Sequence, residues 1–244
     1  MQPAIRFHRD ECIDLPPCIY ETRTVALTPV QAKAYKEMMN QLVTQAEGGE
    51  ITAVNEAVKA QKLLQIAAGC VYDEDGKARV LDATPRLKLV HEIVEDAGTK
   101  VIVFVPFVSA VHMVDEYLVQ QKHTVACIHG GVSKTHRDKI FSDFMNSDNP
   151  KVLVAQPAAM SHGLTLTAAS TIIWYAPITS NDIFEQACGR ITRPGQRNTQ
   201  LILMVEGTDM ERRYYARLKA KQRVQGLLLE AIRSTRESLT QEIT

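Results

Sequence analysis

The hydrophobic positions in the middle of the chain form short continuous runs rather than an alternating pattern. Five runs have this character: residues 100–107 (KVIVFVPF), 124–130 (TVACIHG), 151–156 (KVLVAQ), 170–177 (STIIWYAP) and 199–207 (TQLILMVEG). Amphipathic stretches of helical length lie between several of them, at residues 108–121, 133–146 and 182–193. Short apolar runs that alternate with helices are typical of parallel strands buried on both faces. The pattern therefore predicts an α/β fold with an open, mainly parallel sheet and flanking helices.

The N-terminal third of the chain has a different pattern. Apolar and polar side chains alternate over residues 20–28, which is typical of a strand with one buried face. Such a strand needs a sheet partner, so we expect it to join the edge of the parallel sheet. Thr28 and Pro29 then provide the N-cap and the first position of a helix over residues 28–46, and a second helix is predicted over residues 51–69. These two helices should protrude from the sheet.

The C-terminal residues 208–239 are predicted to be helical and to pack through Tyr214, Tyr215 and Leu218. Their first half carries a basic stripe, made of Arg212, Arg213, Arg217, Lys219, Lys221 and Arg223. A solvated face is the simplest interpretation of such a stripe, and a local contact with a polyanion is the alternative.

Composition narrows the class of protein. The 244 residues include 28 Lys and Arg against 28 Asp and Glu, so no net charge attracts the chain to nucleic acid or to acidic membranes, and any polyanion contact must be local. The five cysteines are scattered without CxxC spacing, which favours a reduced, cytoplasmic setting over disulfides or a zinc site. No apolar run approaches the length of a membrane span, so no membrane partner is expected.

Ligands of open α/β sheets bind outside the carboxyl ends of the strands. Four loops are expected at that edge: residues 106–107, 129–131, 156–165 and 177–181. His129 and His162 in these loops have no partner at the spacing of a metal site or a general base, and the acidic residues 73–75 are expected to form a solvated turn. No metal site is therefore predicted.

The most specific segment is QACGRITRPGQ, residues 186–196. It places Arg190 and Arg193 three residues apart at the end of the predicted helix 182–193. Pro194 and Gly195 should end that helix at once and so determine where the two guanidinium groups project.

The order of these features resembles the second RecA-like lobe of superfamily 2 helicases. The QxxGRxxRPGQ pattern narrows the resemblance to the Swi/Snf-type branch of DNA-dependent ATPases and their phage and bacterial relatives. Further segments similar to that family are residues 15–38 (LPPCIYETRTVALTPVQAKAYKEM), 163–177 (GLTLTAASTIIWYAP) and 205–222 (VEGTDMERRYYARLKAKQ). We accordingly divide the chain into three parts: a lead-in segment with the edge strand and protruding helices (1–85), a RecA-like lobe (86–208) and a C-terminal helical extension (209–244).

The resemblance implies that this chain supplies arginines to ATP with Mg²⁺ that is held mainly by an N-terminal RecA-like lobe, in the same or a separate chain. Arg193 would be the arginine finger, Arg190 would touch the γ-phosphate or brace the cleft, and Gln186 and Gly163 would belong to the nucleotide site. A guanidinium suits this role because its fixed fork of donors can stabilise charge that develops on phosphoryl oxygens.

The resemblance also implies contacts with DNA, expected to be double-stranded. Glycine-rich loops and helix N-termini allow close approach to phosphates. The expected contact residues are Gly130, Gly131, Ser133, Arg137, Ser161 and Thr165. For Arg137, packing within the lobe is an equally good interpretation.

The sequence contains no GxxxxGK[ST] loop and no DExH box, so the chain alone is predicted to be inactive. We expect it to be the C-terminal half of a larger motor, either as a fragment or as one partner of a split pair. The alternative is a stand-alone nucleic-acid-binding or regulatory module that keeps the fold without ATPase activity. Residues 158–161 (AAMS) and 176–181 (APITSN) depart from the family motifs and favour a divergent relative, located in the cytoplasm of a bacterial cell or a phage-infected host.

Overall fold

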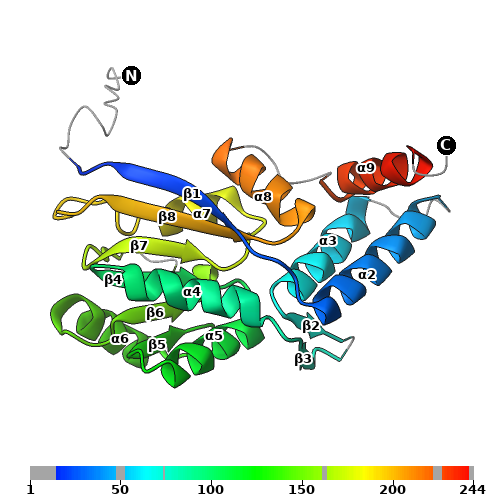
Figure 1. The fold of residues 1–244 in the computed structure, drawn as a ribbon. Coiled ribbons are helices and arrows are strands. Elements are labelled where there is room, and N and C mark those ends of the chain that lie inside the picture. The colour runs from blue at the N-terminus through cyan, green and yellow to red at the C-terminus, as the bar shows by residue number, and fades with distance from the viewer. Residues whose placement is uncertain (1–14, 48–52, 74, 161–163, 222–226, 242–244) are drawn as a thin grey trace, which may run out of the picture.

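A six-stranded parallel sheet forms the centre of the protein (Figure 1). The computed structural model describes residues 15–47, 53–73, 75–160, 164–221 and 227–241. The strand order is β1-β8-β7-β4-β6-β5. The strands are β1 (Cys18–Thr24), β4 (Lys100–Phe104), β5 (Val125–Ile128), β6 (Val152–Ala155), β7 (Ala169–Trp174) and β8 (Gln200–Glu206). Each of the five apolar runs contains one strand, so the predicted open parallel sheet is confirmed.

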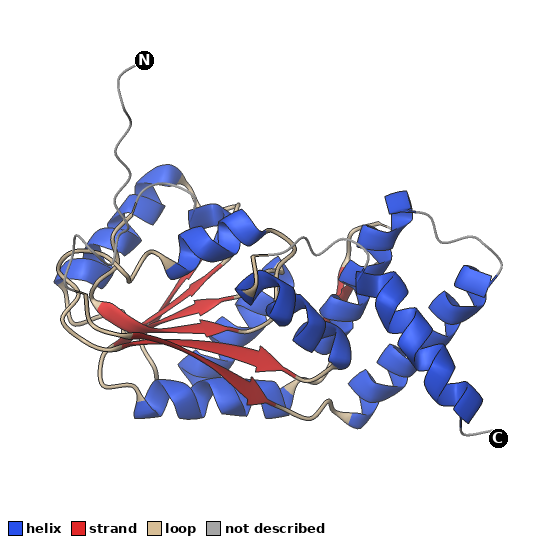
Figure 2. Ribbon diagram, turned by 90° about the horizontal axis from the view of Figure 1, so that it is seen from above, coloured by secondary structure: helices blue, strands red, loops and turns tan. Residues whose placement is uncertain are grey.

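Helices cover both faces of this sheet (Figure 2). They are α4 (Thr84–Asp96), α5 (Val108–Gln120), α6 (Lys134–Asn146), α7 (Asn181–Cys188) and α8 (Asp209–Lys219). In the central strand β4, Val101 and Val103 pack in one apolar cluster with α4 and α5, while Ile102 and Phe104 pack in a second cluster with α6 and α7. Both faces of β4 are therefore buried, which explains why its sequence is apolar without alternation.

The N-terminal strand β1 lies at the edge of the sheet, as predicted. It pairs in parallel with β8 from Cys18 opposite Gln200 to Thr24 opposite Glu206. The strand ends at Thr24, four residues before the predicted limit at Thr28. The division of the chain into three segments stays a prediction, although β1 of the first segment completes the sheet of the second.

Three helices stand beside the carboxyl ends of the strands: α2 (Pro29–Glu47), α3 (Ala53–Ala67) and α9 (Leu227–Gln241) (Figure 1). The predicted N-cap of α2 is confirmed, because Gln31 N donates to Thr28 Oγ1 (3.3 Å) and Thr28 N donates to Gln31 Oε1 (3.1 Å). Glu56 of α3 accepts a hydrogen bond from the backbone of Leu228 (3.2 Å), which links α3 to α9. A short hairpin of β2 (Cys70–Tyr72) and β3 (Ala78–Val80) encloses the predicted polar turn.

A buried ion pair joins α4 to α8. The Arg86 guanidinium is 2.8 Å from Glu211 Oε1, and both side chains are almost inaccessible. Arg86 Nη1 also donates to the carbonyl oxygens of Tyr175, directly after β7, and of Val205, the second-last residue of β8. Glu211 in turn accepts from the backbone of Gly207 (2.7 Å). The pair therefore fastens α4 and α8 to the carboxyl ends of two neighbouring strands.

Two further observations concern the described residues only. No helix among them is long and apolar enough to cross a membrane. Their four cysteines, Cys18, Cys70, Cys127 and Cys188, form no disulfide with one another.

Candidate functional site

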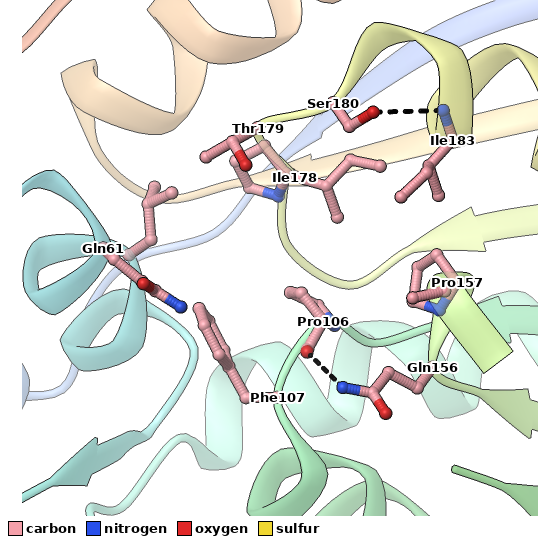
Figure 3. Close-up of a pocket in the computed structure, with 12 residues that line it drawn as sticks. Gln61, Pro106, Phe107, Gln156, Pro157, Ile178, Thr179, Ser180 and Ile183 are labelled. Atoms are coloured by element: carbon pink, nitrogen blue, oxygen red, sulfur yellow. Dashed lines mark hydrogen bonds between the residues drawn. The ribbon is translucent and has the colours of Figure 1, made fainter. Parts of the chain in front are cut away.

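A pocket of about 210 Å³ opens at the carboxyl ends of the strands. In the sheet, β5 and β6 lie on one side of β4, and β7 and β8 lie on the other side. The strand order therefore reverses at β4, where this pocket lies. Residues that follow three strands line the pocket: Pro106 and Phe107 after β4, Gln156 and Pro157 after β6, and Ile178 and Ser180 after β7 (Figure 3). Gln156 Nε2 donates to the carbonyl oxygen of Pro106 (3.2 Å) and ties two of these loops together. Three of the four predicted loops thus meet at one place, where ligands of such sheets bind.

The glycine loop after β5 lies beside this pocket, because Gly130 N donates to Gln156 Oε1 (3.4 Å). Gly131 N donates to Nδ1 of His129 (3.1 Å). Both glycines are exposed. Their N–H groups, which were expected to contact phosphates, instead donate hydrogen bonds to side chains of the lobe. Ser133 is the N-cap of α6 and accepts from the backbone of His136 (3.3 Å).

Arg137 connects the glycine loop to the loop after β6. Its guanidinium donates to the carbonyl oxygens of Ala159 and Val132, both at 3.0 Å. These contacts favour the packing interpretation over direct contact with nucleic acid. Thr165 is exposed, whereas Ser161 and Gly163 lie outside the described residues.

The arginine segment departs from its predicted structure. Helix α7 ends at Cys188, so the expectation of a helix that continues to Arg193 and is ended by Pro194 and Gly195 was wrong. Gly189 follows the helix as its C-cap, and the chain then forms a non-helical turn in which Gly195 has φ +98°. Arg190 and Arg193 therefore project from an irregular loop, which we call the arginine loop (residues 189–196).

Gln196 holds the arginine loop in place. Its buried side-chain amide donates to the carbonyl oxygens of Ala169 (2.9 Å) and Ile191 (3.1 Å). Its oxygen accepts from the backbone of Arg197 (3.0 Å) and Asn198 (3.1 Å). No role was predicted for Gln196 from the sequence. The only available signal was its place after a Pro-Gly turn, where one amide can satisfy backbone donors and acceptors on both sides.

The two arginines of the loop lie close together. Arg190 is 4% exposed, its Nε has no hydrogen-bond partner, and no carboxylate among the described residues forms an ion pair with it. Burial and the neighbouring charge of Arg193 lower the pKa of Arg190. Arg193 is half-buried, and its Nε donates to the carbonyl oxygen of Gly189 (3.3 Å). Gln186 lies one turn earlier on α7 and is exposed.

The arginine loop and the pocket lie at opposite ends of β7. Gln196 contacts Ala169, the first residue of the strand, and Arg190 O accepts from Leu166 N (2.9 Å) just before it. Six extended residues separate these contacts from the pocket, which corresponds to roughly 20 Å. The expectation that all candidate chemistry lies at the carboxyl ends therefore holds for the pocket and not for the arginines.

The basic stripe is largely neutralised within the lobe. Helix α8 packs through Tyr214, Tyr215 and Leu218, as predicted. Four stripe residues have carboxylate partners: Arg212 with Glu206 and Asp209, Arg213 with Asp209, Arg217 with Glu230, and Lys221 with Glu185. Lys219 is exposed, and Arg223 lies outside the described residues. The described part of the stripe thus offers little unpaired charge.

Part of this chain is similar to known protein sequences. Residues 85–195 match the family model of the helicase conserved C-terminal domain. The chain is 28% identical over 159 residues to the human chromatin-remodeling ATPase INO80, covering 64% of this chain and 10% of that protein. It is 27% identical over 213 residues to protein p41 of Acyrthosiphon pisum secondary endosymbiont phage 1, covering 84% of this chain and 44% of that protein. The chain thus spans less than half the length of these relatives.

Solved structures with the same fold include two from Sulfolobus solfataricus. The SWI2/SNF2 ATPase core in complex with double-stranded DNA matches with a TM-score of 0.66 at 24% identity, over 85% of this chain and 44% of that chain. The C-terminal domain of the SWI2/SNF2 ATPase matches with a TM-score of 0.63 at 22% identity, over 84% of this chain and 86% of that chain.

Proposed function

We propose that the chain is the C-terminal, RecA-like lobe of a Snf2-type superfamily 2 helicase and that it forms the second half of an ATP-driven motor that acts on DNA. In this motor an N-terminal lobe holds ATP with Mg²⁺, and the present chain supplies Arg193 and Arg190 across the cleft between the lobes. The sequence contains neither a phosphate-binding GxxxxGK[ST] loop nor a DExH box, so hydrolysis requires the other lobe.

The observation that carries this proposal is the state of Arg190. A buried guanidinium without a counter-ion costs stability, because its lost hydration is not replaced. Burial lowers the pKa of Arg190, and the neighbouring positive charge of Arg193 lowers it further, which adds to this cost. An anion between the two arginines would remove both unfavourable effects. The triphosphate of a nucleotide has the charge and the bidentate geometry that guanidinium groups bind best.

The two arginines take different roles in the proposed mechanism. Arg193 is the more accessible, so it reaches the γ-phosphate and stabilises charge in the transition state. Arg190 lies deeper and is linked through its carbonyl to Leu166, so it supports the loop and adds positive potential behind Arg193. Gln196 keeps the loop in one conformation before the nucleotide arrives, which is how binding groups contribute most to catalysis.

DNA is the proposed substrate because the matching Sulfolobus ATPase core was solved with double-stranded DNA. We assign the DNA side of the lobe to the carboxyl-end loops, where the exposed Gly130, Gly131 and Ser133 surround the N-terminus of α6. Thr165 belongs to the segment that connects this side to the arginine loop. Arg137 then acts indirectly, by holding the glycine loop in place.

Mutation of the arginine loop in a protein with both lobes tests the proposal. Arg193→Ala should reduce DNA-stimulated ATP hydrolysis by roughly 10³-fold, since that is the usual contribution of an arginine finger. Arg193→Lys should not restore turnover, because an ammonium group lacks the guanidinium fork. The matched control is Arg197→Ala, an exposed arginine of the same segment whose loss should leave turnover within about two-fold.

The variants are also compared for DNA binding and thermal stability, so that loss of fold is separated from loss of catalysis. Turnover within a few-fold of the wild type in Arg193→Ala would remove this residue from the mechanism and favour a binding module without ATPase activity. The isolated 244-residue chain should show no hydrolysis above background, and magnesium-dependent hydrolysis that disappears in the Arg193 variant would contradict that expectation.

A further inference from the structure

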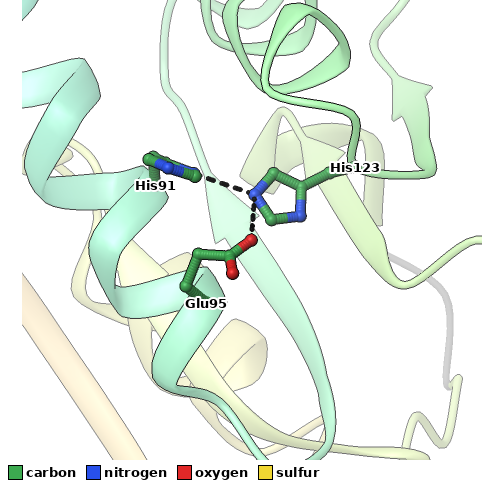
Figure 4. A group of neighbouring side chains, drawn as sticks. All are labelled: His91, Glu95 and His123. Carbon is green, nitrogen blue, oxygen red and sulfur yellow. Dashed lines mark hydrogen bonds and ion pairs between the residues drawn. The ribbon is translucent and has the colours of Figure 1, made fainter.

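Three potential ligand side chains converge where the second half of α4 meets the segment between α5 and β5 (Figure 4). His91 and Glu95 belong to α4, and His123 lies between α5 and β5. The distance from His91 Nδ1 to His123 Nε2 is 2.9 Å, and from His123 Nε2 to Glu95 Oε1 it is 3.2 Å. All three ligand atoms lie within 4.8 Å of one another. The cluster is separate from both the pocket and the arginine loop.

The backbone determines this convergence. His91 and Glu95 are four residues apart on a helix, so their side chains lie on the same face. His123 is held by the end of α5, where Lys122 has φ +69° and His123 N donates to the carbonyl oxygen of Leu118 (3.0 Å). A left-handed residue with such a bond closes a Schellman motif, which is a well-defined helix end. The ligand atoms therefore meet because one face of α4 lies beside the end of α5.

Hydrogen bonding alone does not satisfy the cluster. His123 Nε2 carries either one proton or one lone pair, yet both His91 Nδ1 and Glu95 Oε1 lie within hydrogen-bonding distance of it. If this nitrogen is protonated and donates to the carboxylate, it has no lone pair with which to accept a hydrogen bond from His91. If it accepts from His91, it has no proton for Glu95. One of the two short contacts is therefore poorly satisfied in either tautomer.

We propose that His91, Glu95 and His123 bind a divalent transition-metal ion of the zinc class. A cation resolves the conflict because it accepts a lone pair from each of the three atoms. Zn²⁺ binds two imidazoles and one carboxylate with bonds of about 2.0–2.2 Å, which places the ligand atoms of a tetrahedral site roughly 3.3 Å apart. Two of the three distances are already close to this value. The Glu95 side chain is 58% exposed and free to rotate toward the ion.

The ion would tie α4 to the segment that leads into β5. The His123 side chain is only 5% exposed, so one ligand is preorganised inside the lobe, while the exposed Glu95 leaves an approach from solvent. Three protein ligands leave the fourth position of a tetrahedron for water. The cluster touches neither Arg190 nor the carboxyl-end pocket, so we assign the ion to stability of this face of the sheet rather than to catalysis.

Zinc titration of the purified, metal-free 244-residue chain tests the site. Competition with a chromophoric zinc indicator should reveal one high-affinity ion per chain, and Co²⁺ should give the absorption bands of a tetrahedral site. His91→Gln, Glu95→Gln and His123→Gln should each weaken binding by at least ten-fold. His136→Gln, an exposed histidine of α6 outside the cluster, is the matched control and should bind as the wild type does.

A thermal shift provides an independent readout. Zinc should raise the midpoint of unfolding of the wild type and of His136→Gln, and should not raise that of Glu95→Gln. Glu95 is exposed, so its substitution should not impair folding even if His123→Gln does. Absence of stoichiometric zinc binding would overturn the proposal. Equal binding by His91→Gln, Glu95→Gln and the wild type would also overturn it, because the ion would then bind elsewhere.

Discussion

Two buried arginines at the two ends of β7 differ in almost every respect except their burial. Arg86 is 2% exposed and lies beyond the carboxyl end of the strand, where it pairs with Glu211 and two carbonyl oxygens. Arg190 is 4% exposed and lies near the beginning of the strand, with an unpaired Nε and a second arginine beside it. Burial of a guanidinium therefore does not identify its role. The partners of the guanidinium do identify it: Arg86 pairs with Glu211, whereas Arg190 has no carboxylate partner among the residues that the structure describes.

Along β7, Arg86 thus serves the stability of the fold, whereas Arg190 is the candidate for function. A paired buried charge is costly to break, because removal of one partner leaves the other buried and unpaired. An unpaired buried charge lowers the free energy of unfolding. Its removal should therefore stabilise the folded state and, at the same time, abolish the function that the charge serves. The two arginines should thus respond to mutation with opposite signs.

The largest change in stability is expected for Arg86→Ala, which should lower the free energy of unfolding by about 3–5 kcal/mol, because Glu211 would remain buried without its partner. Urea denaturation followed by circular dichroism measures this value. Arg79→Ala, at an exposed arginine of β3, is the control and should change stability by less than about 0.5 kcal/mol. A loss below about 1 kcal/mol in Arg86→Ala would show that the pair does not hold α4 and α8 to the sheet.

An intermediate effect is expected for Gln196→Ala, at about 1–3 kcal/mol, because four backbone groups lose their hydrogen-bond partner at once. Hydrogen exchange should accelerate locally at the amides of Arg197 and Asn198. The exposed Gln186→Ala on α7 is the matched control and should leave exchange unchanged. Unaltered protection of the two amides in Gln196→Ala would mean that the arginine loop is ordered by other contacts.

The smallest effect, and the one that bears most directly on the comparison, is expected for Arg190→Met. The long apolar side chain keeps much of the volume and removes the charge, so the free energy of unfolding should stay the same or rise by up to about 1 kcal/mol. Urea denaturation under the conditions used for Arg86→Ala makes the two values comparable. A destabilisation similar to that of Arg86→Ala would show that Arg190 is a structural residue, and would remove the main support for the proposed motor role.

The sheet was predictable because its signal is local. Apolar runs without alternation identify strands buried on both faces, and the alternation that begins at Tyr20 identifies an edge strand. The N-cap at Thr28 was predictable for the same reason, since the bond it makes reaches only three residues along the chain. The order of motifs produced the resemblance to helicases, and residues 85–195 match the helicase conserved C-terminal domain.

The remaining features depend on contacts between residues distant in sequence. The arginine loop is shaped by Gln196, whose amide bonds Ala169, 27 residues away, and no local pattern distinguishes that loop from a longer helix. The pairing of Arg217 and Lys221 in the basic stripe was not predictable, because their partners Glu230 and Glu185 lie outside α8. The histidine cluster was missed because His91 lies on α4 and His123 lies 32 residues later, between α5 and β5, so the two have no motif spacing.

The pairing of β1 with β8 has a consequence for synthesis of the chain. Gln200 Nε2 donates to the carbonyl oxygen of Pro16, 184 residues earlier. A ribosome that adds about 5–20 residues per second therefore leaves β1 without its partner for roughly 10–40 s. During this interval Ile19 and Tyr20 belong to an unpaired, partly apolar segment of nascent chain, which is the kind of segment that chaperones bind. The sheet can close its first edge only after its last strand has been translated.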